Sequence, residues 1–261
     1  MLRSLWKYRG FVASSIRREL RVRYAGSALG AAWQVLSPLA LISIYTVVFA
    51  ELMRTRLTGV DDRFGYAIFV CSGLLAWNMF AEILLRSQGM FVEHSNLLKK
   101  ASFPRICLPV IVVGSAVSNF AVVYGVFLTL LLVSGRFPGP VVIYALAPLA
   151  LLALLAAGLG ILLGTVHVFF RDVGQVVGIV LQLVFWLSPI VYPLAALPKQ
   201  YAEWIAYNPL TPIAKTLQEV FVNGAAPPMD ALFFPFVVSI FVAAAAWAVF
   251  KRQAPFVVDE L

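Results

Sequence analysis

The sequence predicts an all-α integral membrane protein with six transmembrane helices, an N-terminal amphipathic interface helix, and re-entrant short helices between the fifth and sixth spans. Three observations predict this fold class. Six long apolar stretches alternate with basic or proline-rich connections, and a helix needs about 20 apolar residues to cross the roughly 30 Å hydrocarbon core. The composition is 62% hydrophobic and 12% charged, whereas about a quarter of a soluble domain is charged. Most of the positive charge falls on one side of the predicted spans.

The six spans account for most of the 261 residues, so we expect a single membrane domain covering 1–261. An amphipathic segment (1–30) precedes the membrane-embedded region (31–250), and a short tail (251–261) follows it. The spans lie near Ala31–Ala50, Gly65–Leu85, Ile106–Val133, Val141–Val168, Val173–Leu197 and Ala231–Phe250. This arrangement leaves no room for an appended soluble catalytic domain. The first apolar run is long enough to span and starts late, which indicates a retained anchor and not a cleaved signal peptide.

The distribution of basic residues predicts the orientation. Of the 20 lysines and arginines, most lie in the N-terminal segment, the second connection, the fourth connection and the C-terminal tail. The positive-inside rule therefore places both termini in the cytoplasm. The net charge of +8 needs no nucleic-acid partner to explain it, because the basic residues flank membrane spans and lie next to anionic lipid headgroups.

The N-terminal segment predicts an amphipathic helix. Its apolar residues recur every four positions and form one stripe: Val12, Ile16, Leu20 and Tyr24. The neighbouring arginines fall largely off this stripe: Arg17, Arg18 and Arg21. We expect such a helix to lie flat at the membrane surface, with its apolar face in lipid and its arginines toward phosphates. Its role is either that of a simple anchor or that of a moving part that contacts a cytoplasmic partner.

The longest predicted cytoplasmic loop follows the second span. Its core predicts a short helix in which Ser95 or Asn96 supplies the N-cap oxygen and Lys99 and Lys100 lie near the C-terminal end. Pro104 ends this helix, because proline disfavours a helical conformation in the residue before it. A short helix across the cytoplasmic mouth suits docking to a partner, and a solvated surface loop is the alternative.

The fifth span is short and its far end is irregular. Regular helix from Val173 to Leu187 rises only about 22 Å, less than the hydrocarbon thickness. Prolines then follow one another through an apolar stretch: Pro189, Pro193 and Pro198. Non-helical backbone at that depth is tolerated only when it is buried in protein or faces a water-filled cavity. We therefore expect a re-entrant pair of short helices, around Ile190–Leu197 and Thr211–Val222, at a translocation path or gate. An ordinary external loop is the alternative.

The sequence does not display the residue patterns of an enzyme. His94 and His167 are the two histidines, and they lie in different segments. The chain contains neither a glycine-rich phosphate loop with its lysine nor a zinc-binding helix of the His-Glu-x-x-His type. Cys71 and Cys107 lie in different spans, and we expect both to be small buried residues and not a disulfide or metal pair.

Glu82 is the one acidic residue well inside a predicted span. Carboxylates within a membrane are usually functional. Glu82 is also predicted to lie within a turn of the cytoplasmic end, where it can pair with Arg86 four residues later. We favour this local ion pair over a role in transport.

Aromatic residues make up 13% of the chain. Several lie where a channel could be lined: Trp33, Tyr45, Phe49, Trp77, Phe80, Phe185, Trp186 and Tyr192. Aromatic rings pack well against the apolar faces of sugars. Packing within the protein and the aromatic belts of membrane interfaces are the alternative explanation.

Five short motifs follow one another along nearly the whole chain. They are Arg18-Glu19-Leu20-Arg21-Val22-Arg23-Tyr24 with Ser27-Ala28-Leu29-Gly30, Trp33 and Pro38; Asn96-Leu97-Leu98-Lys99-Lys100 with Phe103-Pro104-Arg105 and Leu108-Pro109; Phe170-Arg171-Asp172; Ser188-Pro189-Ile190 with Pro193; and Asn208-Pro209. In this order they resemble the ABC-2 type transporter permeases that export O-antigen, capsular polysaccharide and teichoic-acid polymers. The single domain of 1–261 is thereby identified as an ABC-2 type transmembrane domain.

The resemblance implies a homodimeric permease that associates with two copies of a separate cytoplasmic ABC ATPase. ATP and magnesium would bind to that partner, so this chain would be a transport subunit without a cofactor and not an enzyme. The docking loop for the ATPase would comprise Ser95, Asn96, Leu97, Leu98, Lys99, Lys100, Phe103, Pro104 and Arg105. The interface helix beside it would carry Arg17, Arg18, Arg21, Arg23 and Tyr24.

The resemblance also implies that an undecaprenyl-linked polysaccharide threads a channel between two protomers, lined by the aromatic residues named above. The external gate of this channel would comprise Pro189, Pro193, Pro198, Asn208 and Pro209. The resulting hypothesis is ATP-driven export of a lipid-linked polysaccharide, with O-antigen favoured, across the bacterial inner membrane. An ABC exporter of drugs, lipids or other small amphiphiles is the first alternative, and an intramembrane enzyme acting on lipid-linked sugars is the second.

Overall fold

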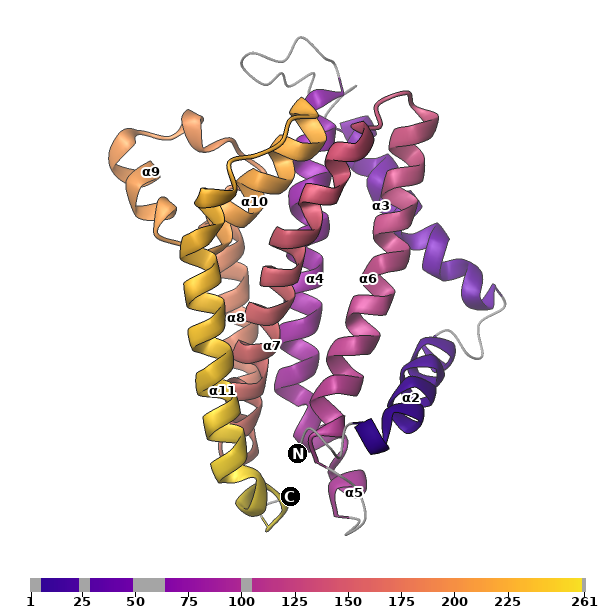
Figure 1. Ribbon diagram of the computed structural model, residues 1–261, viewed down its shortest axis with the longest axis vertical. Helices are drawn as coiled ribbons and strands as arrows, with labels where there is room; N and C mark the ends of the chain where they lie inside the picture. The colour runs from indigo at the N-terminus through magenta and orange to yellow at the C-terminus, as the bar shows by residue number, and fades with distance from the viewer. Residues whose placement is uncertain (1–5, 24–28, 49–63, 100–104, 260–261) are drawn as a thin grey trace.

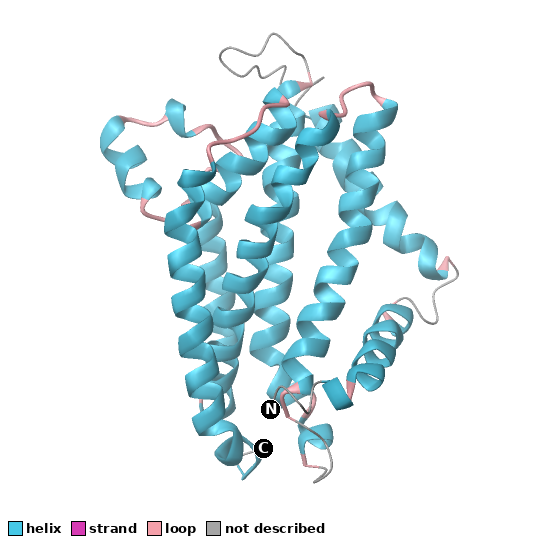
Figure 2. Cartoon of the chain, viewed as in Figure 1, coloured by secondary structure: helices cyan, strands magenta, loops and turns pink. Residues whose placement is uncertain are grey.

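The computed structural model describes residues 6–23, 29–48, 64–99 and 105–259, and the regular structure in these ranges is helical (Figures 1 and 2). A bundle of long helices forms the body of the protein: α4 (Gly65–Glu93), α6 (Cys107–Val133), α7 (Leu146–Phe169) and α11 (Phe233–Asp259). Two shorter apolar helices join it: α3 (Trp33–Thr46) and α8 (Val173–Trp186). The protein is therefore an all-helical membrane protein.

Four helical stretches among the described residues are long and apolar enough to cross a membrane: 65–93, 107–133, 139–169 and 229–253. They coincide with the second, third, fourth and sixth predicted spans. The first and fifth predicted spans correspond to α3 and α8, which are 14 residues each. The short helix predicted for the start of the fifth span is confirmed, because α8 ends at Trp186.

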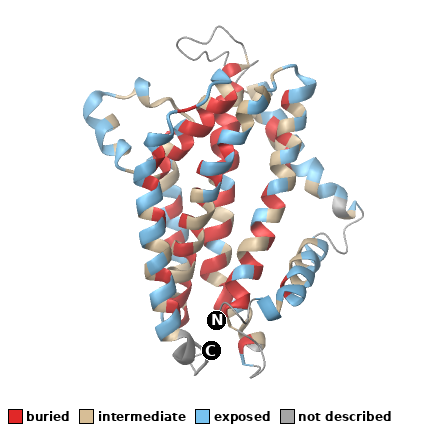
Figure 3. Cartoon of the chain, viewed as in Figure 1, coloured by how far each residue is buried: buried red, intermediate tan, exposed pale blue. Residues whose placement is uncertain are grey.

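Helix α4 lies at the centre of the bundle and α11 at its edge. Two-thirds (67%) of the apolar window of α4 is buried, whereas 22% of that of α11 is buried. Figure 3 shows the same contrast, with buried residues along α4 and exposed residues along the outer side of α11. Side chains of α4 contact α3, α6, α7, α8 and the proline-rich segment after α8. Helix α4 is therefore the common contact of these elements.

Glycines let α7 approach α4 closely. A Cβ atom on Gly160 would lie 2.5 Å from the Cβ atom of Ser87, and one on Gly164 would lie 2.7 Å from the Ser87 carbonyl oxygen. Ser87 itself is fully buried. Small residues four positions apart commonly allow such close packing of membrane helices. The packing of α4 on α7 thus depends on the absence of side chains at these two glycines.

The N-terminal amphipathic helix is confirmed as α2 (Arg9–Val22), but its apolar stripe does not face lipid as expected. Val12 is buried in a cluster with Ile111 and other residues of α4 and α6, and Ile16 packs against that cluster. The Cδ1 atom of Ile16 lies 2.7 Å from the position of a Cβ on Gly114 of α6. The stripe is therefore a protein contact, because a glycine on α6 provides a surface close enough to receive it. Tyr24 lies outside the described residues.

The short helix predicted after the second span is confirmed as α5 (Ser95–Leu98), but its predicted N-cap is wrong. His94 occupies the N-cap position and makes no side-chain cap hydrogen bond. The reason is that α4 continues to Glu93, beyond its predicted end, so the chain turns directly from one helix into the other. The backbone N–H of Leu98 then donates to the His94 carbonyl at 3.1 Å. Lys100, Phe103 and Pro104 lie outside the described residues, as does the side chain of Asn96.

The proline-rich segment after α8 contains α9 (Lys199–Ala206) and α10 (Leu210–Gln218), followed by a π-helical turn to Asn223. The second predicted short helix is therefore confirmed. The first is wrong, because Ile190–Leu197 holds only a short 3₁₀ turn at Leu194–Ala196. Pro193 and Pro198 are extended, with ψ angles of 137° and 141°, and α9 begins only after Pro198. Prolines at this spacing remove the amide donors that a helix would need.

We expect the substitution Gly164→Val to destabilise the protein by about 1–3 kcal/mol, because the new side chain would force α7 away from α4. Gly125→Val in α6 is the matched control, since a Cβ atom there has no other heavy atom within 4 Å. The measurement is thermal unfolding of the purified variants in detergent. Equal melting temperatures for the two variants would contradict the role of Gly164 in packing.

Candidate functional site

Helix α8 exposes a face that contains polar side chains. Gln175 and Gln182 are both exposed, and they lie seven residues apart, about two helical turns, on the same side of the helix. Val176, Ile179 and Leu183 are exposed on neighbouring positions. Amide groups lose hydrogen bonds when they enter hydrocarbon. This face of α8 therefore suits contact with water or with another protein better than contact with lipid tails.

Helix α11 provides the comparison. Its exposed residues from 233 to 248 are all apolar: Phe233, Phe234, Phe236, Val237, Ile240, Phe241, Ala244, Trp247 and Ala248. Such a surface is suited to lipid. Because two helices of the same bundle expose such different surfaces, we distinguish a lipid-facing side at α11 from a polar-bearing side at α8.

Four of the aromatic residues singled out in the sequence form one cluster between α4 and α8: Trp77, Phe80, Phe185 and Trp186. The ring of Trp77 lies 5.7 Å from that of Phe80 and 5.4 Å from that of Phe185, and Phe185 lies 5.2 Å from Trp186. Phe80 is buried in the core, whereas Trp186 is 59% exposed. The cluster thus runs from the core to the exposed face of α8.

The remaining aromatic candidates are dispersed. Trp33 is exposed at the start of α3, whereas Tyr45 packs on the core. Tyr192 follows α8 and donates a hydrogen bond from its hydroxyl to the Trp186 carbonyl at 2.7 Å. Phe49 lies outside the described residues. The structure therefore brings the second-span and fifth-span aromatics together, and Tyr45 packs against the same buried cluster as Trp77 and Phe185.

Asn208 fixes the broken end of α8. Its Nδ2 atom donates to the Ser188 hydroxyl at 3.0 Å and to the Leu187 carbonyl at 3.3 Å. Its Oδ1 atom accepts a hydrogen bond from the Leu210 amide at 3.0 Å, at the start of α10. Pro189, next to Ser188, is buried. Asn208 thus ties the end of α8 to the start of α10, so these two candidate gate residues, Asn208 and Pro189, lie in one connected structure.

Two further residues hold this segment and were not found from the sequence. The Nε2 atom of Gln218 in α10 donates to the Pro189 carbonyl at 2.9 Å, and the hydroxyl of Tyr66 in α4 donates to the Val191 carbonyl at 2.5 Å. Carbonyl groups in an irregular buried segment need donors from elsewhere. The run of prolines predicts that carbonyl groups in this segment need outside donors, but the sequence does not reveal which distant side chains supply them.

The predicted ion pair of Glu82 is present but is not its closest contact. The Nη1 atom of Arg86 lies 3.8 Å from Glu82 Oε1, whereas Nη1 of Arg23, the C-cap residue of α2, lies 2.6 Å from the same oxygen. Glu82 also lies deeper than expected, because α4 extends three turns beyond it to Glu93. Of the other arginines proposed for the interface helix, Arg17, Arg18 and Arg21 are exposed.

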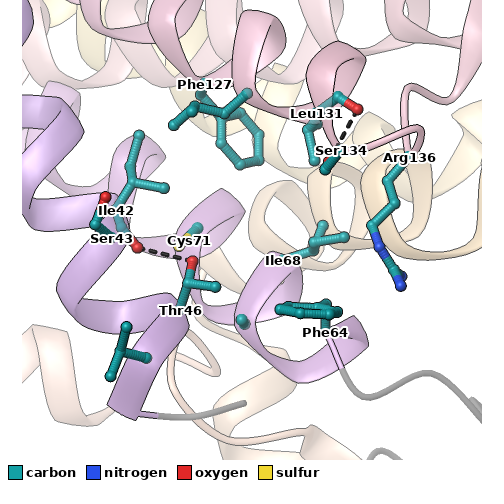
Figure 4. Close-up of a pocket in the computed structure, with 13 residues that line it drawn as sticks. Ile42, Ser43, Thr46, Phe64, Ile68, Cys71, Phe127, Leu131, Ser134 and Arg136 are labelled. Carbon is teal, nitrogen blue, oxygen red and sulfur yellow. Dashed lines mark hydrogen bonds between the residues drawn. The ribbon is translucent and has the colours of Figure 1, made fainter. Parts of the chain in front are cut away.

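An apolar cavity of about 570 Å³ lies between α3, α4 and α6 (Figure 4). Ile42, Ile68 and Phe127 line it, and Arg136 lies at its rim with the guanidinium 4.9 Å from the Phe64 ring centre. The hydroxyls of Thr46 and Ser134 donate to carbonyls of their own helices. A cavity of this size and lining suits a hydrocarbon chain or another apolar group.

The profile of the family described as ABC-2 type transporter matches residues 12–222, so the chain belongs to that family. It is a permease subunit: a membrane transport domain that lacks the catalytic ATPase and binds no cofactor itself. A permease of this kind implies a partner ATPase subunit.

Three relatives are similar over most of their length. The O-antigen export system permease protein RfbA of Myxococcus xanthus is 30% identical over 256 residues, which cover 97% of this chain and 96% of the relative. RfbA of Klebsiella pneumoniae is 29% identical over 79% of this chain and 78% of its own length. The polysialic acid transport protein KpsM of Escherichia coli is 25% identical over 79% of each chain. The chain is thus a multi-pass membrane protein related to bacterial export systems.

We expect Gln218→Leu to loosen the segment after α8, because it leaves the buried Pro189 carbonyl without a donor, at a cost of about 1–3 kcal/mol. The exposed Gln200 in α9 offers the matched control Gln200→Leu. The measurement is limited proteolysis between residues 190 and 206 in detergent. Cleavage of the Gln218→Leu variant at the rate of the control would contradict this role of Gln218.

Proposed function

We propose that the chain is the permease of an ATP-driven exporter of polysaccharide, with O-antigen as the favoured cargo. The RfbA relatives are permeases of O-antigen export, and the KpsM relative transports another polysaccharide, polysialic acid. The cargo is linked to undecaprenyl lipid and crosses the bacterial inner membrane. Six spans cross that membrane, with α3 and α8 as the first and fifth, and both termini lie in the cytoplasm. The 14 residues of α8 are short for a full crossing, so α8 is best placed beside a passage.

The exposed glutamines of α8 are the observation that carries this proposal. Two protomers that bring their α8 helices toward each other enclose Gln175 and Gln182 in a shared passage and leave α11 toward lipid. Amide groups can donate to and accept from sugar hydroxyls, and aromatic rings can pack against the apolar faces of sugars. Trp186, Phe185 and Trp77 lie at the outer part of this passage. Phe80 supports them from the core.

The segment from Pro189 to Pro209 acts as the external gate in this proposal. Its start is tied to α4 and α10 by Tyr66 and Gln218, and its end is tied to Ser188 by Asn208. Between them, α9 projects away from the bundle (Figure 1). A segment held at both ends and exposed between them can change its path without unfolding the helices that hold it. Asn208 is then the fixed point of the gate.

The α5 region is the docking site for the ATPase in this proposal. Helix α5 lies beyond the end of α4, at the end of the bundle where α2 begins and α11 finishes (Figure 1). Leu98 is buried against α4 and α6, while Lys99 is exposed. The buried leucine fixes the short helix on the bundle. The exposed lysine binds an acidic surface of the ATPase, and each of the two protomers docks one ATPase copy.

We expect a cysteine at position 182 to react with a membrane-impermeant maleimide and one at position 241 to remain protected. Gln182→Cys lies on the proposed passage, and Phe241→Cys lies on the lipid-facing side, where Phe241 is 72% exposed in the single chain. The native Cys71 and Cys107 are buried and give a low background. Labelling is measured in membranes that contain the complex with its ATPase, with and without nucleotide. Protection of both positions in every nucleotide state would argue against a passage at α8.

A further inference from the structure

Four charged side chains join α2 to α4 in an alternating order. Glu19 Oε2 lies 2.5 Å from Arg86 Nη2, and Glu82 Oε1 lies 2.6 Å from Arg23 Nη1. Arg86 also approaches Glu82, at 3.8 Å, and so connects the two pairs. We call Glu19, Arg86, Glu82 and Arg23 the four-charge cluster. Helix α4 contributes Glu82 and Arg86, and α2 contributes Glu19 together with its C-cap residue Arg23.

Helix α6 supplies a neutral donor to each carboxylate of the cluster. The Ser115 hydroxyl lies 2.7 Å from Glu19 Oε2, and Asn119 Nδ2 donates to Glu82 Oε2 at 3.0 Å. Ser115 and Asn119 are one turn apart and both are buried. The cluster therefore links three helices, and each carboxylate is held between a guanidinium and a donor from α6.

The position of the cluster makes such complete pairing necessary. Glu82 lies eleven residues before the end of α4, roughly 16 Å along the helix axis, and both α4 and α6 are predominantly apolar. Charges at such depth are costly unless they are paired and hydrogen-bonded. A cleft lined by Arg18, Glu19, Arg23, Arg86 and His94 opens beside the cluster, and 20–43% of the four side chains remains exposed. The pairs are thus accessible enough to rearrange.

The four-charge cluster is not the sole contact of α2 with the bundle. Val12 and Ile16 already seat α2 on α6 through apolar contacts. The four-charge cluster lies instead at the C-terminal end of α2, at the last described residue before the chain passes to α3. Ion pairs constrain direction as well as distance, and replacing a buried pair by apolar residues often leaves stability unchanged. The cluster therefore fixes the direction of α2 relative to α4 and α6.

We propose that the four-charge cluster transmits movement of α2 to α4 and α6, so that its members are positioning residues for transport. This inference rests on the proposed function, since it assigns to α2 the step between ATP hydrolysis in the partner and movement of the spans. A push on α2 reaches Glu82 through Arg23 and reaches Arg86 through Glu19. From there it acts on α4, which contacts α8 and the gate segment.

The test is a charge exchange in the complex of permease and ATPase, reconstituted into proteoliposomes with its polysaccharide. Arg23→Glu and Glu82→Arg, each alone, place like charges together, and we expect about a tenfold fall in polymer transported per ATP hydrolysed. The fourfold variant E19R/R23E/E82R/R86E reverses every charge and keeps the alternating order, so it should recover the ratio to within about threefold. Arg17→Glu is the control, because Arg17 is exposed on the same helix outside the cluster, and its ratio should stay near that of the unmodified protein.

A cross-link distinguishes variants that no longer transmit movement of α2 from variants in which α2 has lost its place on α6. Cysteines introduced as Ile16→Cys and Gly114→Cys report whether α2 remains seated on α6. We expect the cross-link to form in the single charge variants while transport per ATP falls. Glu82→Gln, which keeps the shape of the side chain, should also form the cross-link and should show a smaller fall in transport per ATP.

The outcomes distinguish this inference from the proposed function. A fall in transport per ATP that the fourfold variant does not reverse, with the cross-link intact, would overturn the role of the cluster. So would single charge variants that transport as the unmodified complex does. An unmodified complex that hydrolyses ATP without moving polysaccharide would overturn the proposed function itself, and this inference with it.

Discussion

Much of the structure follows from one constraint: a polar group in a predominantly apolar bundle is costly unless it is paired or hydrogen-bonded. The carbonyls released by the prolines after α8 receive donors from Gln218 and Tyr66. Glu82 and Glu19 each lie between a guanidinium and a donor from α6. Among the residues that the structure describes, no side chain is seen to hydrogen-bond the exposed glutamines of α8, and we therefore place a water-filled passage or a second protomer beside them. The same constraint thus marks the gate, the four-charge cluster and the passage.

Helix α4 connects these regions. Tyr66 holds the gate segment near its first turn, Trp77 contacts Phe185 of α8 farther along, and Ser87 receives the glycines of α7. Glu82 and Arg86 join α4 to α2. One rigid helix therefore contacts the proposed input from the ATPase, the proposed passage and the proposed gate. Its burial on several sides favours movement as a unit over local bending.

The sequence predicted the elements that depend on local pattern. Apolar length placed the four long helices, the prolines predicted the early end of α8, and the four-residue period of Val12 and Ile16 predicted α2. The errors concern choices made in three dimensions. The stripe of α2 was assigned to lipid because a helical pattern does not reveal that Gly114 provides a protein surface for it. The predicted pair of Glu82 with Arg86 is present, but its closer partner Arg23 was missed because it is 59 residues away. Gln218 and Tyr66 were missed for the same reason.

The central claim is that this chain provides the passage through the membrane while the energy comes from a separate ATPase at its cytoplasmic end. The most direct measurement compares purified permease alone with the permease–ATPase complex in proteoliposomes that contain lipid-linked polysaccharide. The account predicts that the permease alone neither hydrolyses ATP nor moves the polysaccharide, and that the complex does both. Hydrolysis of ATP or movement of the polysaccharide by the permease alone would contradict it.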